Sequence, residues 1–249
     1  GEIAALPSSE IVSPLCRALF SGFVAERREG NDGSETLLRV LSLLALITFP
    51  LTVGLSLVAY PVIKLAFGTA WLAAVPLVQV LGVSAMVSLF SAVSEALFSA
   101  HAWLKTIIWM SATGMVLRIL LLLVLIPHYG LLGGAFAAAI MSVYQESVYL
   151  VTGMRRLRVR VRTILAGVIR PVAAVALMAA VLAWAGLGWT DWDGSNAELS
   201  INLARAVGLG AVLYIVSVTG LWFAAGRPAG AEADALSIIE RIAFRSGRS

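Results

Sequence analysis

The chain has 249 residues, of which 60% are hydrophobic and only 13% are charged. Because soluble domains carry about 25% charged residues, this composition excludes an ordinary soluble protein and indicates one that lies in a membrane. The formal net charge is +4, and the single cysteine, Cys16, excludes an internal disulfide.

The first part of the chain differs from the rest. Residues 1–24 are largely apolar but contain Glu10, Pro14 and Arg17. This composition predicts a partial transmembrane helix over 1–24. The polar stretch that follows predicts a cytoplasmic loop over 25–36.

Six apolar segments of membrane-spanning length come next. About 20 apolar residues cross the hydrocarbon core, where backbone polar groups must be paired within a helix or a closed barrel. The segments lack the period-two alternation of barrel strands, which favours helices. We therefore predict an all-α polytopic integral membrane protein, with a bundle of six full transmembrane helices over 37–226 and a cytoplasmic tail over 227–249. The apolar segments lie at 37–60, 74–98, 106–126, 131–152, 164–187 and 203–224.

The connections between these segments alternate in charge. Basic residues gather before the first segment, in the run 155–162 and in the tail, whereas 127–130 has no Lys or Arg and 186–202 is an acidic loop. Cytoplasmic loops of membrane proteins carry an excess of Lys and Arg. The alternation therefore predicts a multi-pass protein with a cytoplasmic C-terminus. It also attributes the basic charge to topology and anionic lipid, with no nucleic-acid partner.

Two prolines and one tight turn mark irregular positions. Pro50 and Pro171 lie inside apolar segments and should bend or break their helices locally. The turn at 127–130 should join its neighbouring segments as an antiparallel hairpin. The second arm of this hairpin opens with Gly133 and Gly134, which form a small-residue face that lets another helix approach closely.

Several short strings within 10–155 share one pattern with a known family. They are Phe49-Pro50, Gly54-Leu55, Ala59-Tyr60-Pro61, Leu65-Ala66-Phe67-Gly68-Thr69-Ala70-Trp71 with Pro76, Leu97-Phe98-Ser99-Ala100-His101, and Pro127-His128-Tyr129-Gly130-Leu131-Leu132-Gly133-Gly134-Ala135. These strings resemble the polysaccharide transporter family, the oligosaccharide flippases of the superfamily that also contains the MATE multidrug exporters. The Ala100-His101-Ala102 turn departs from the small turn usual in that family.

The resemblance implies transport without bond chemistry. Members of the family are thought to pass isoprenoid diphosphate-linked oligosaccharides across the bacterial inner (cytoplasmic) membrane, in polysaccharide or lipopolysaccharide biosynthesis. Two helical lobes alternate access to a central cavity in a MATE-like fold. The implied partners are membrane lipid, the lipid-linked oligosaccharide and the N-terminal half of the same transporter. On this resemblance we expect the chain to be a C-terminal portion that is inactive by itself.

Three arginines are candidates for lining a polar cavity: Arg118, Arg17 and Arg170. Arg118 lies deepest, roughly 20 Å from Lys105 at about 1.5 Å rise per residue. Because a lone charge in the membrane interior is costly, Arg118 should bind the diphosphate or an acidic sugar, or form an ion pair with Glu146 or Glu95. For Arg170 the favoured interpretation is snorkelling to the cytoplasmic interface.

Glu95, Gln145 and Glu146 are the remaining candidates for the cavity. A buried carboxylate there could carry a coupling proton, or it could simply neutralise an arginine. Serines at 84, 88, 91 and 94 mark one polar face of the same helix as Glu95. Such serines more often mediate packing or bond their own backbone than line a cavity.

The sequence contains no nucleophile–base pair, metal-ligand cluster or P-loop. We therefore expect a transporter and not an enzyme, with no cofactor and no metal. The alternatives are another transporter of the same superfamily, such as a lipid II flippase or a cation-coupled multidrug exporter, and an inactive membrane fragment. Arg17, Arg118 and Arg170 argue against a carrier of cationic drugs, which would prefer acidic residues in its cavity.

Overall fold

The computed structural model describes residues 34–157, 161–192 and 194–226, and all the regular structure in these ranges is helical. The partial helix over 1–24 with Arg17, nearly all of the loop over 25–36, and the tail over 227–249 lie outside the described residues. The elements are α2 (Ser34–Leu57), α3 (Ala59–Phe67), the 3-10 helix η1 (Thr69–Ala74), α4 (Val75–Val87), α5 (Leu89–Ala100), α6 (Leu104–Leu157), α7 (Val161–Trp184) and α8 (Asn196–Ala224).

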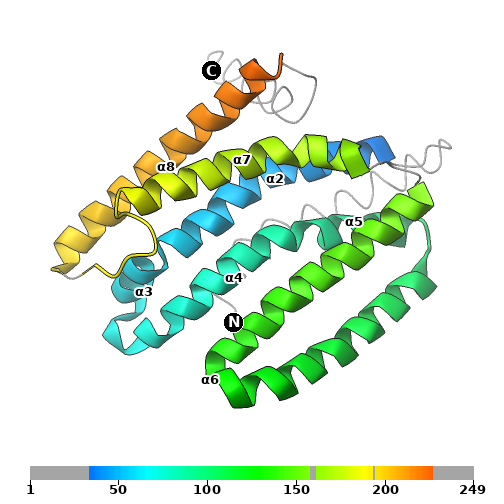
Figure 1. Ribbon diagram of the computed structural model, residues 1–249, viewed down its shortest axis with the longest axis horizontal. Helices are drawn as coiled ribbons and strands as arrows, with labels where there is room; N and C mark the ends of the chain where they lie inside the picture. The colour runs from blue at the N-terminus through cyan, green and yellow to red at the C-terminus, as the bar shows by residue number, and fades with distance from the viewer. Residues whose placement is uncertain (1–33, 158–160, 193, 227–249) are drawn as a thin grey trace, which may run out of the picture.

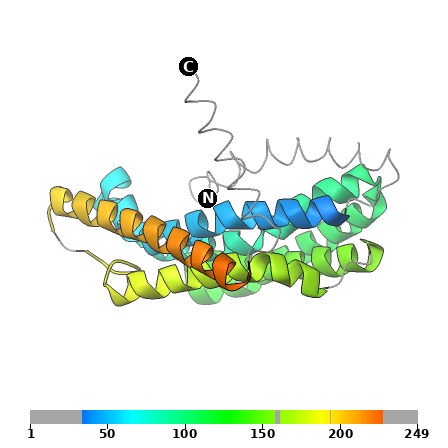
Figure 2. The ribbon, with the colours of Figure 1, turned by 90° about the horizontal axis from the view of Figure 1, so that it is seen from above.

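The helices run roughly along one long axis, side by side (Figures 1 and 2). Five helical segments of the described residues are long and apolar enough to cross a membrane, namely α2, α6, α7, α8 and the segment Thr69–Met86 that joins η1 to α4. The longest, α6, reverses at Gly130 (φ 57°, ψ −135°) and so contributes two membrane-length arms, 104–129 and 131–157. The described residues therefore hold six membrane-length segments, and the prediction of an all-α polytopic membrane protein is confirmed.

The connections alternate between the two ends of the bundle (Figure 1). The α5–α6 and α6–α7 connections lie at one end, which we call the basic end because Lys105, Arg155, Arg156 and Arg162 flank them. The α3–η1–α4 turn, the reversal of α6 and the α7–α8 loop lie at the other end. This is the arrangement that the charge alternation of the sequence predicts.

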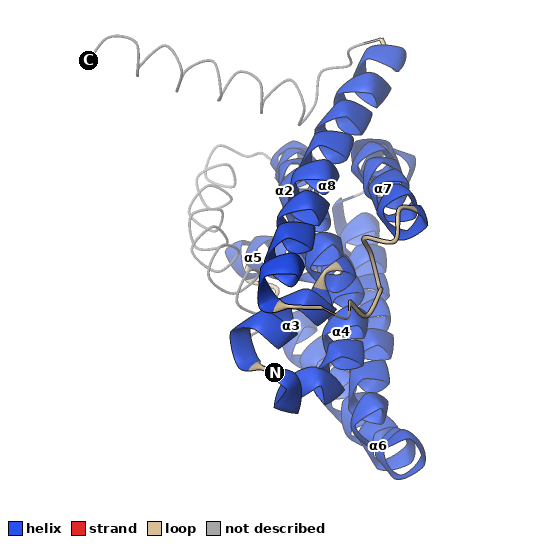
Figure 3. Cartoon of the chain, turned by 90° about the vertical axis from the view of Figure 1, so that its left-hand side faces the viewer, coloured by secondary structure: helices blue, strands red, loops and turns tan. Residues whose placement is uncertain are grey.

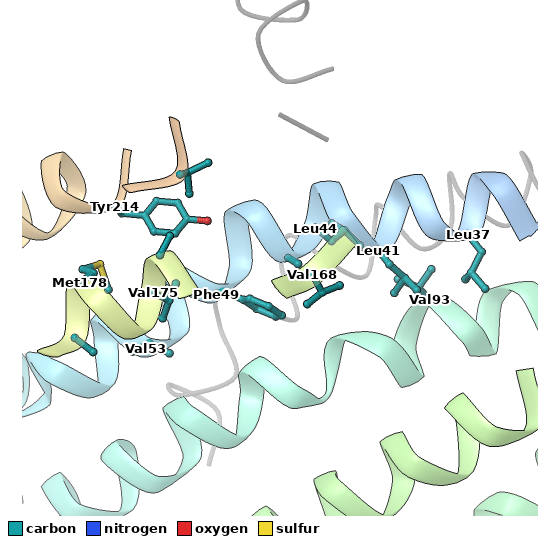
Figure 4. Packing of buried hydrophobic residues seen from close by; sticks show 14 of the residues in the cluster. Leu37, Leu41, Leu44, Phe49, Val53, Val93, Val168, Val175, Met178 and Tyr214 are labelled. Carbon is teal, nitrogen blue, oxygen red and sulfur yellow. The ribbon is translucent and has the colours of Figure 1, made fainter. Parts of the chain in front are cut away.

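The core is built around α2, which packs against α4, α5 and α7. Leu37, Leu41, Ala45, Phe49 and Val53 are buried along one face of α2, at the four-residue spacing of a helix. They meet side chains of α5, α7 and α8 that are labelled in Figure 4: Val93, Val168, Val175, Met178 and Tyr214. In contrast, the first arm of α6 and much of α8 expose apolar side chains, as surfaces that face lipid or other protein do.

Neither proline within a predicted segment ends its helix, since α2 continues through Pro50 and α7 through Pro171. The predicted helix over 37–60 instead ends at Leu57, and α3 restarts after Val58. The next predicted helix, over 74–98, is divided at Ser88 into α4 and α5. The Ser88 hydroxyl lies 3.3 Å from the carbonyl oxygens of Ser84 and Ala85, so it competes for the backbone of the preceding turn.

The start of α8 corrects the predicted acidic loop over 186–202. The helix begins at Asn196 because Ser195 and Glu198 form a capping box. The Ser195 hydroxyl accepts from the backbone N–H of Glu198 at 3.3 Å, and the Glu198 carboxylate accepts from the backbone N–H of Ser195 at 2.9 Å. Glu198 therefore belongs to the first turn of a membrane-length helix.

The hairpin predicted at 127–130 is present as the reversal of α6, and it depends on Gly133. A Cβ atom on Gly133 would collide with the backbone carbonyl of Leu125, whereas one on Gly134 would meet nothing within 4 Å. The absence of a side chain at Gly133 thus allows the two arms of α6 to approach each other closely.

Candidate functional site

The break between α4 and α5 brings together a helix end and a carboxylate. Ser91 is the third residue of α5, so its N–H is one of the donors that a helix start leaves without a helical partner. The Glu146 carboxylate, from the second arm of α6, accepts from this N–H through Oε1 at 2.9 Å. A carboxylate at this position also interacts favourably with the positive end of the helix dipole.

Glu146 is buried, with 7% of its surface exposed. Its second oxygen, Oε2, is buried and has no hydrogen-bond partner in the part of the chain that the structure describes. The ion pair between Arg118 and Glu146 that the sequence left open is therefore not formed among these residues. Glu146 instead accepts a hydrogen bond from the backbone N–H of Ser91.

The two polar candidates nearest to Glu146 point elsewhere. Gln145 precedes it on α6 but is exposed, because adjacent residues on a helix face different directions. Glu95 lies one turn beyond Ser91 on α5 and is also exposed. Of the candidates that the structure describes, only Glu146 therefore lies at the break between α4 and α5.

The arginine candidates do not converge on Glu146. Arg118 is exposed on the first arm of α6, among exposed apolar side chains such as Met115, Ile119 and Leu120. Arg170 is half-buried on α7, directly before Pro171. The candidate residues are thus distributed over α5, α6 and α7 and form no single cluster among the described residues.

Tyr214 satisfies a backbone carbonyl that a proline leaves free. Pro50 has no N–H, so the carbonyl of Leu46, four residues earlier, lacks its helical donor. The Tyr214 hydroxyl of α8 donates to this carbonyl oxygen at 2.7 Å. The bond links α8 to the middle of α2, where an unpaired carbonyl in an apolar environment would be costly.

The same arrangement occurs at the C-terminal end of α2. Pro61 leaves the Leu57 carbonyl without its helical donor, and the backbone N–H of Trp189 donates to it at 2.9 Å. The Trp189 indole N–H also donates to the Ser56 hydroxyl at 3.2 Å, and this hydroxyl donates to the Gln79 carbonyl at 2.8 Å. Trp189 makes these bonds from a left-handed backbone conformation (φ 53°).

Trp189 belongs to the α7–α8 loop, residues 185–195, which runs from the end of α7 past α3 to the start of α8 (Figure 3). Lys64 of α3 holds the same loop, since its ammonium donates to the Trp192 carbonyl at 3.2 Å and to the Tyr60 hydroxyl at 3.4 Å. The loop is therefore bound to both α2 and α3.

Sequence reasoning missed Tyr214 and Trp189 as bonding partners of α2. The prolines at 50 and 61 did carry a signal, because each one identifies the carbonyl that needs another donor. No sequence pattern identified the donor itself, since Tyr214 lies 168 residues away from Leu46 along the chain.

An apolar groove of about 640 Å³ lies between α2, α3, α7 and α8. Its walls are almost entirely hydrocarbon, which suits a lipid chain better than a polar ligand. The lining residues include Ile47, Leu51, Val62, Leu182, Val207 and Ile215.

At the basic end, Arg156 fastens the second arm of α6 to the start of the first. Its guanidinium donates to the Thr106 hydroxyl at 2.9 Å and lies 4.7 Å from the ring centroid of Trp103. Three further basic side chains that flank the α5–α6 and α6–α7 connections are exposed: Lys105, Arg155 and Arg162. This end can therefore attract anionic lipid head groups.

Parts of the chain are similar to known proteins of polysaccharide biosynthesis. Residues 1–76 match the family described as "Polysaccharide biosynthesis protein". The chain is also 35% identical over 82 residues to the teichuronic acid biosynthesis protein TuaB of Bacillus subtilis (strain 168). Both matches support a member of the polysaccharide transporter family.

Both matches cover only part of the chain. The similarity to TuaB spans 33% of this chain and 17% of TuaB. The matched residues 1–76 contain α2, α3 and the Phe49-to-Pro76 strings that carried the resemblance in the sequence. Glu146 and Tyr214 lie outside the matched residues 1–76.

Proposed function

We propose that this chain is part of a transporter that moves isoprenoid diphosphate-linked oligosaccharide across the cytoplasmic membrane by alternating access. The observation that carries the proposal is the match of residues 1–76 to the polysaccharide biosynthesis family, on a chain whose described part is a bundle of membrane-length helices. In this account the chain catalyses no bond chemistry and needs no cofactor.

The apolar groove between α2, α3, α7 and α8 supports the lipid part of the proposed substrate. A polyisoprenoid is a long branched hydrocarbon, and a groove of about 640 Å³ with hydrocarbon walls offers it favourable contacts. The groove therefore favours a substrate that carries a hydrocarbon chain.

Arg118 supports the anionic part. An exposed arginine in the middle of a membrane-length arm is costly unless it faces water or an anion. A guanidinium can bind a diphosphate through two parallel hydrogen bonds. We therefore assign Arg118 to the diphosphate or an acidic sugar.

The basic end supports the proposed orientation. Lys105, Arg155, Arg156 and Arg162 flank the α5–α6 and α6–α7 connections, and such residues are enriched on the cytoplasmic side. We place this end, and with it the C-terminus of α8, in the cytoplasm. The proposed partners at this end are anionic membrane lipids and the head of the lipid-linked substrate.

Depletion of the full-length protein from its own cells tests the proposal. Isoprenoid-linked oligosaccharides should accumulate in the membrane while the exported polysaccharide falls, and Arg118→Ala should reproduce both changes. Unchanged export without accumulation would show the proposal to be wrong. Accumulation of a cell-wall precursor in place of the oligosaccharide would favour a lipid II flippase.

A further inference from the structure

We propose that Glu146 is a proton-binding site that couples transport to a proton gradient by attaching the second arm of α6 to the start of α5. The inference rests on the transport function proposed above and adds the coupling ion and the contact on which it acts. It depends on three observations: the helix break at Ser88, the bond to Ser91 and the buried, unpartnered oxygen of Glu146.

The helix break creates the binding position. In one continuous helix the N–H of Ser91 would bond to the carbonyl four residues earlier, but the break at Ser88 makes Ser91 part of a first turn. Its N–H donates to Glu146 Oε1 at 2.9 Å. A helix of 12 residues begins here, so the carboxylate lies at the positive end of a substantial dipole.

The second oxygen is where a proton can bind. Glu146 is 7% exposed, and its Oε2 has no hydrogen-bond partner among the described residues. A carboxylate oxygen in an apolar interior without a donor is unfavourable, and a proton on it removes the charge. The bond to Ser91 occupies only Oε1, so Oε2 is free to take the proton.

No cation of the described residues neutralises Glu146. Among the elements packed against α6, α4 has no titratable side chain and α5 has only Glu95. On the first arm of α6, Arg118 is exposed and makes no ion pair with Glu146. On α6 itself, Tyr144 and Tyr149 lie within one turn of Glu146, and Tyr149 is buried. A proton is therefore the simplest counter-charge available at this position.

Proton binding would change the strength of the contact between α6 and α5. The ionised carboxylate forms a charge-assisted hydrogen bond to Ser91 and is attracted by the dipole of α5. The neutral acid keeps at most an ordinary hydrogen bond, so the two helices separate more easily. A proton taken up at Oε2 from water on one side and released to the other leaves no net change in the protein, as a transport cycle requires.

Carbodiimide labelling of the wild-type protein tests proton binding without any assay of transport. A hydrophobic carbodiimide reacts with protonated carboxyl groups in apolar surroundings. In the full-length protein in lipid nanodiscs, mass spectrometry should find the adduct at Glu146, with a yield that rises as the pH falls. Absence of the adduct at Glu146 at every pH would overturn the proposal, whether or not the protein proves to be a flippase.

Two matched variants of the full-length protein test the coupling. Glu146→Gln keeps an acceptor for Ser91 but cannot exchange a proton, and Glu95→Gln makes the same change at an exposed position on α5. In proteoliposomes, an imposed pH gradient should accelerate wild-type and E95Q transport, and E146Q should lose that acceleration. Acceleration retained in E146Q, or wild-type transport that responds to a sodium gradient and not to pH, would overturn it.

Discussion

The hydroxyl of Tyr214 donates to the backbone carbonyl of Leu46 at 2.7 Å, and this is the carbonyl that Pro50 deprives of its helical donor. A proline in a membrane helix is tolerated when a neighbouring group satisfies the freed carbonyl. Here the neighbour is α8, so the bond fixes one particular position of α8 on α2. Tyr214 therefore contributes a specific hydrogen bond in addition to the packing of its ring.

Tyr214→Phe should destabilise the protein while leaving the packing of the ring unchanged. The Leu46 carbonyl would be left unpaired, which costs about 1–3 kcal/mol. Thermal unfolding of the purified protein in detergent measures the loss. Tyr144→Phe is the matched control, since Tyr144 makes no hydrogen bond within the described residues.

A double variant distinguishes this mechanism from a general loss of packing. Pro50→Ala restores an N–H that can donate to the Leu46 carbonyl within α2. The cost of Tyr214→Phe should therefore be smaller in the Pro50→Ala background than in the wild type. Equal costs in both backgrounds would mean that the tyrosine does not act through this carbonyl.

Trp189→Phe should loosen the α7–α8 loop. The change removes the indole N–H that donates to the Ser56 hydroxyl at 3.2 Å but keeps an aromatic ring, for a loss of about 0.5–1.5 kcal/mol. Hydrogen exchange of the loop residues should become faster. Trp184→Phe, at a position 90% exposed, is the control and should leave the exchange unchanged.

Gly133→Ala should disrupt the hairpin of α6, because its Cβ would collide with the Leu125 carbonyl. Forced overpacking of this kind typically costs about 1–3 kcal/mol. Gly134→Ala, one residue away with nothing within 4 Å of its Cβ, should be neutral or up to about 1 kcal/mol more stable. Unfolding temperatures of the two variants in detergent give the comparison, and similar values would contradict the close approach of the two arms.

Arg118→Ala should abolish transport by the full-length protein and leave its insertion and stability unchanged. The guanidinium is exposed on the first arm of α6 and makes no ion pair with Glu146. Arg205→Ala, at a position on α8 that is also exposed, is the matched control and should transport normally. Arg118→Lys should recover only part of the activity, because an ammonium cannot make the bidentate contact of a guanidinium.

The spans and the hairpin were predictable because they depend on local properties of the chain. Runs of apolar residues gave the membrane-length helices, and the Pro127-to-Gly130 turn gave the reversal of α6. The start of α8 was also predictable, since Ser195 and Glu198 have the spacing of a capping box, but the acidic residues before them favoured a loop.

The candidate site was predictable only in part. Glu146 was a candidate by its residue type and depth, but its partner is a backbone N–H that exists only because the helix breaks at Ser88. The four- and three-residue spacing of Ser84, Ser88 and Ser91 indicated a continuous helical face, so it concealed the break. A contact made by a helix end depends on tertiary structure and leaves no pattern in the composition.

Reconstitution of the purified full-length protein measures the central claim most directly. A fluorescent isoprenoid diphosphate-linked oligosaccharide is placed in both leaflets of proteoliposomes, and a membrane-impermeant quencher is added outside. Transport predicts that quenching proceeds beyond the outer-leaflet fraction, at a rate that Arg118→Ala abolishes and Arg205→Ala preserves. Quenching that stops at the outer-leaflet fraction, as in protein-free liposomes, would contradict the account.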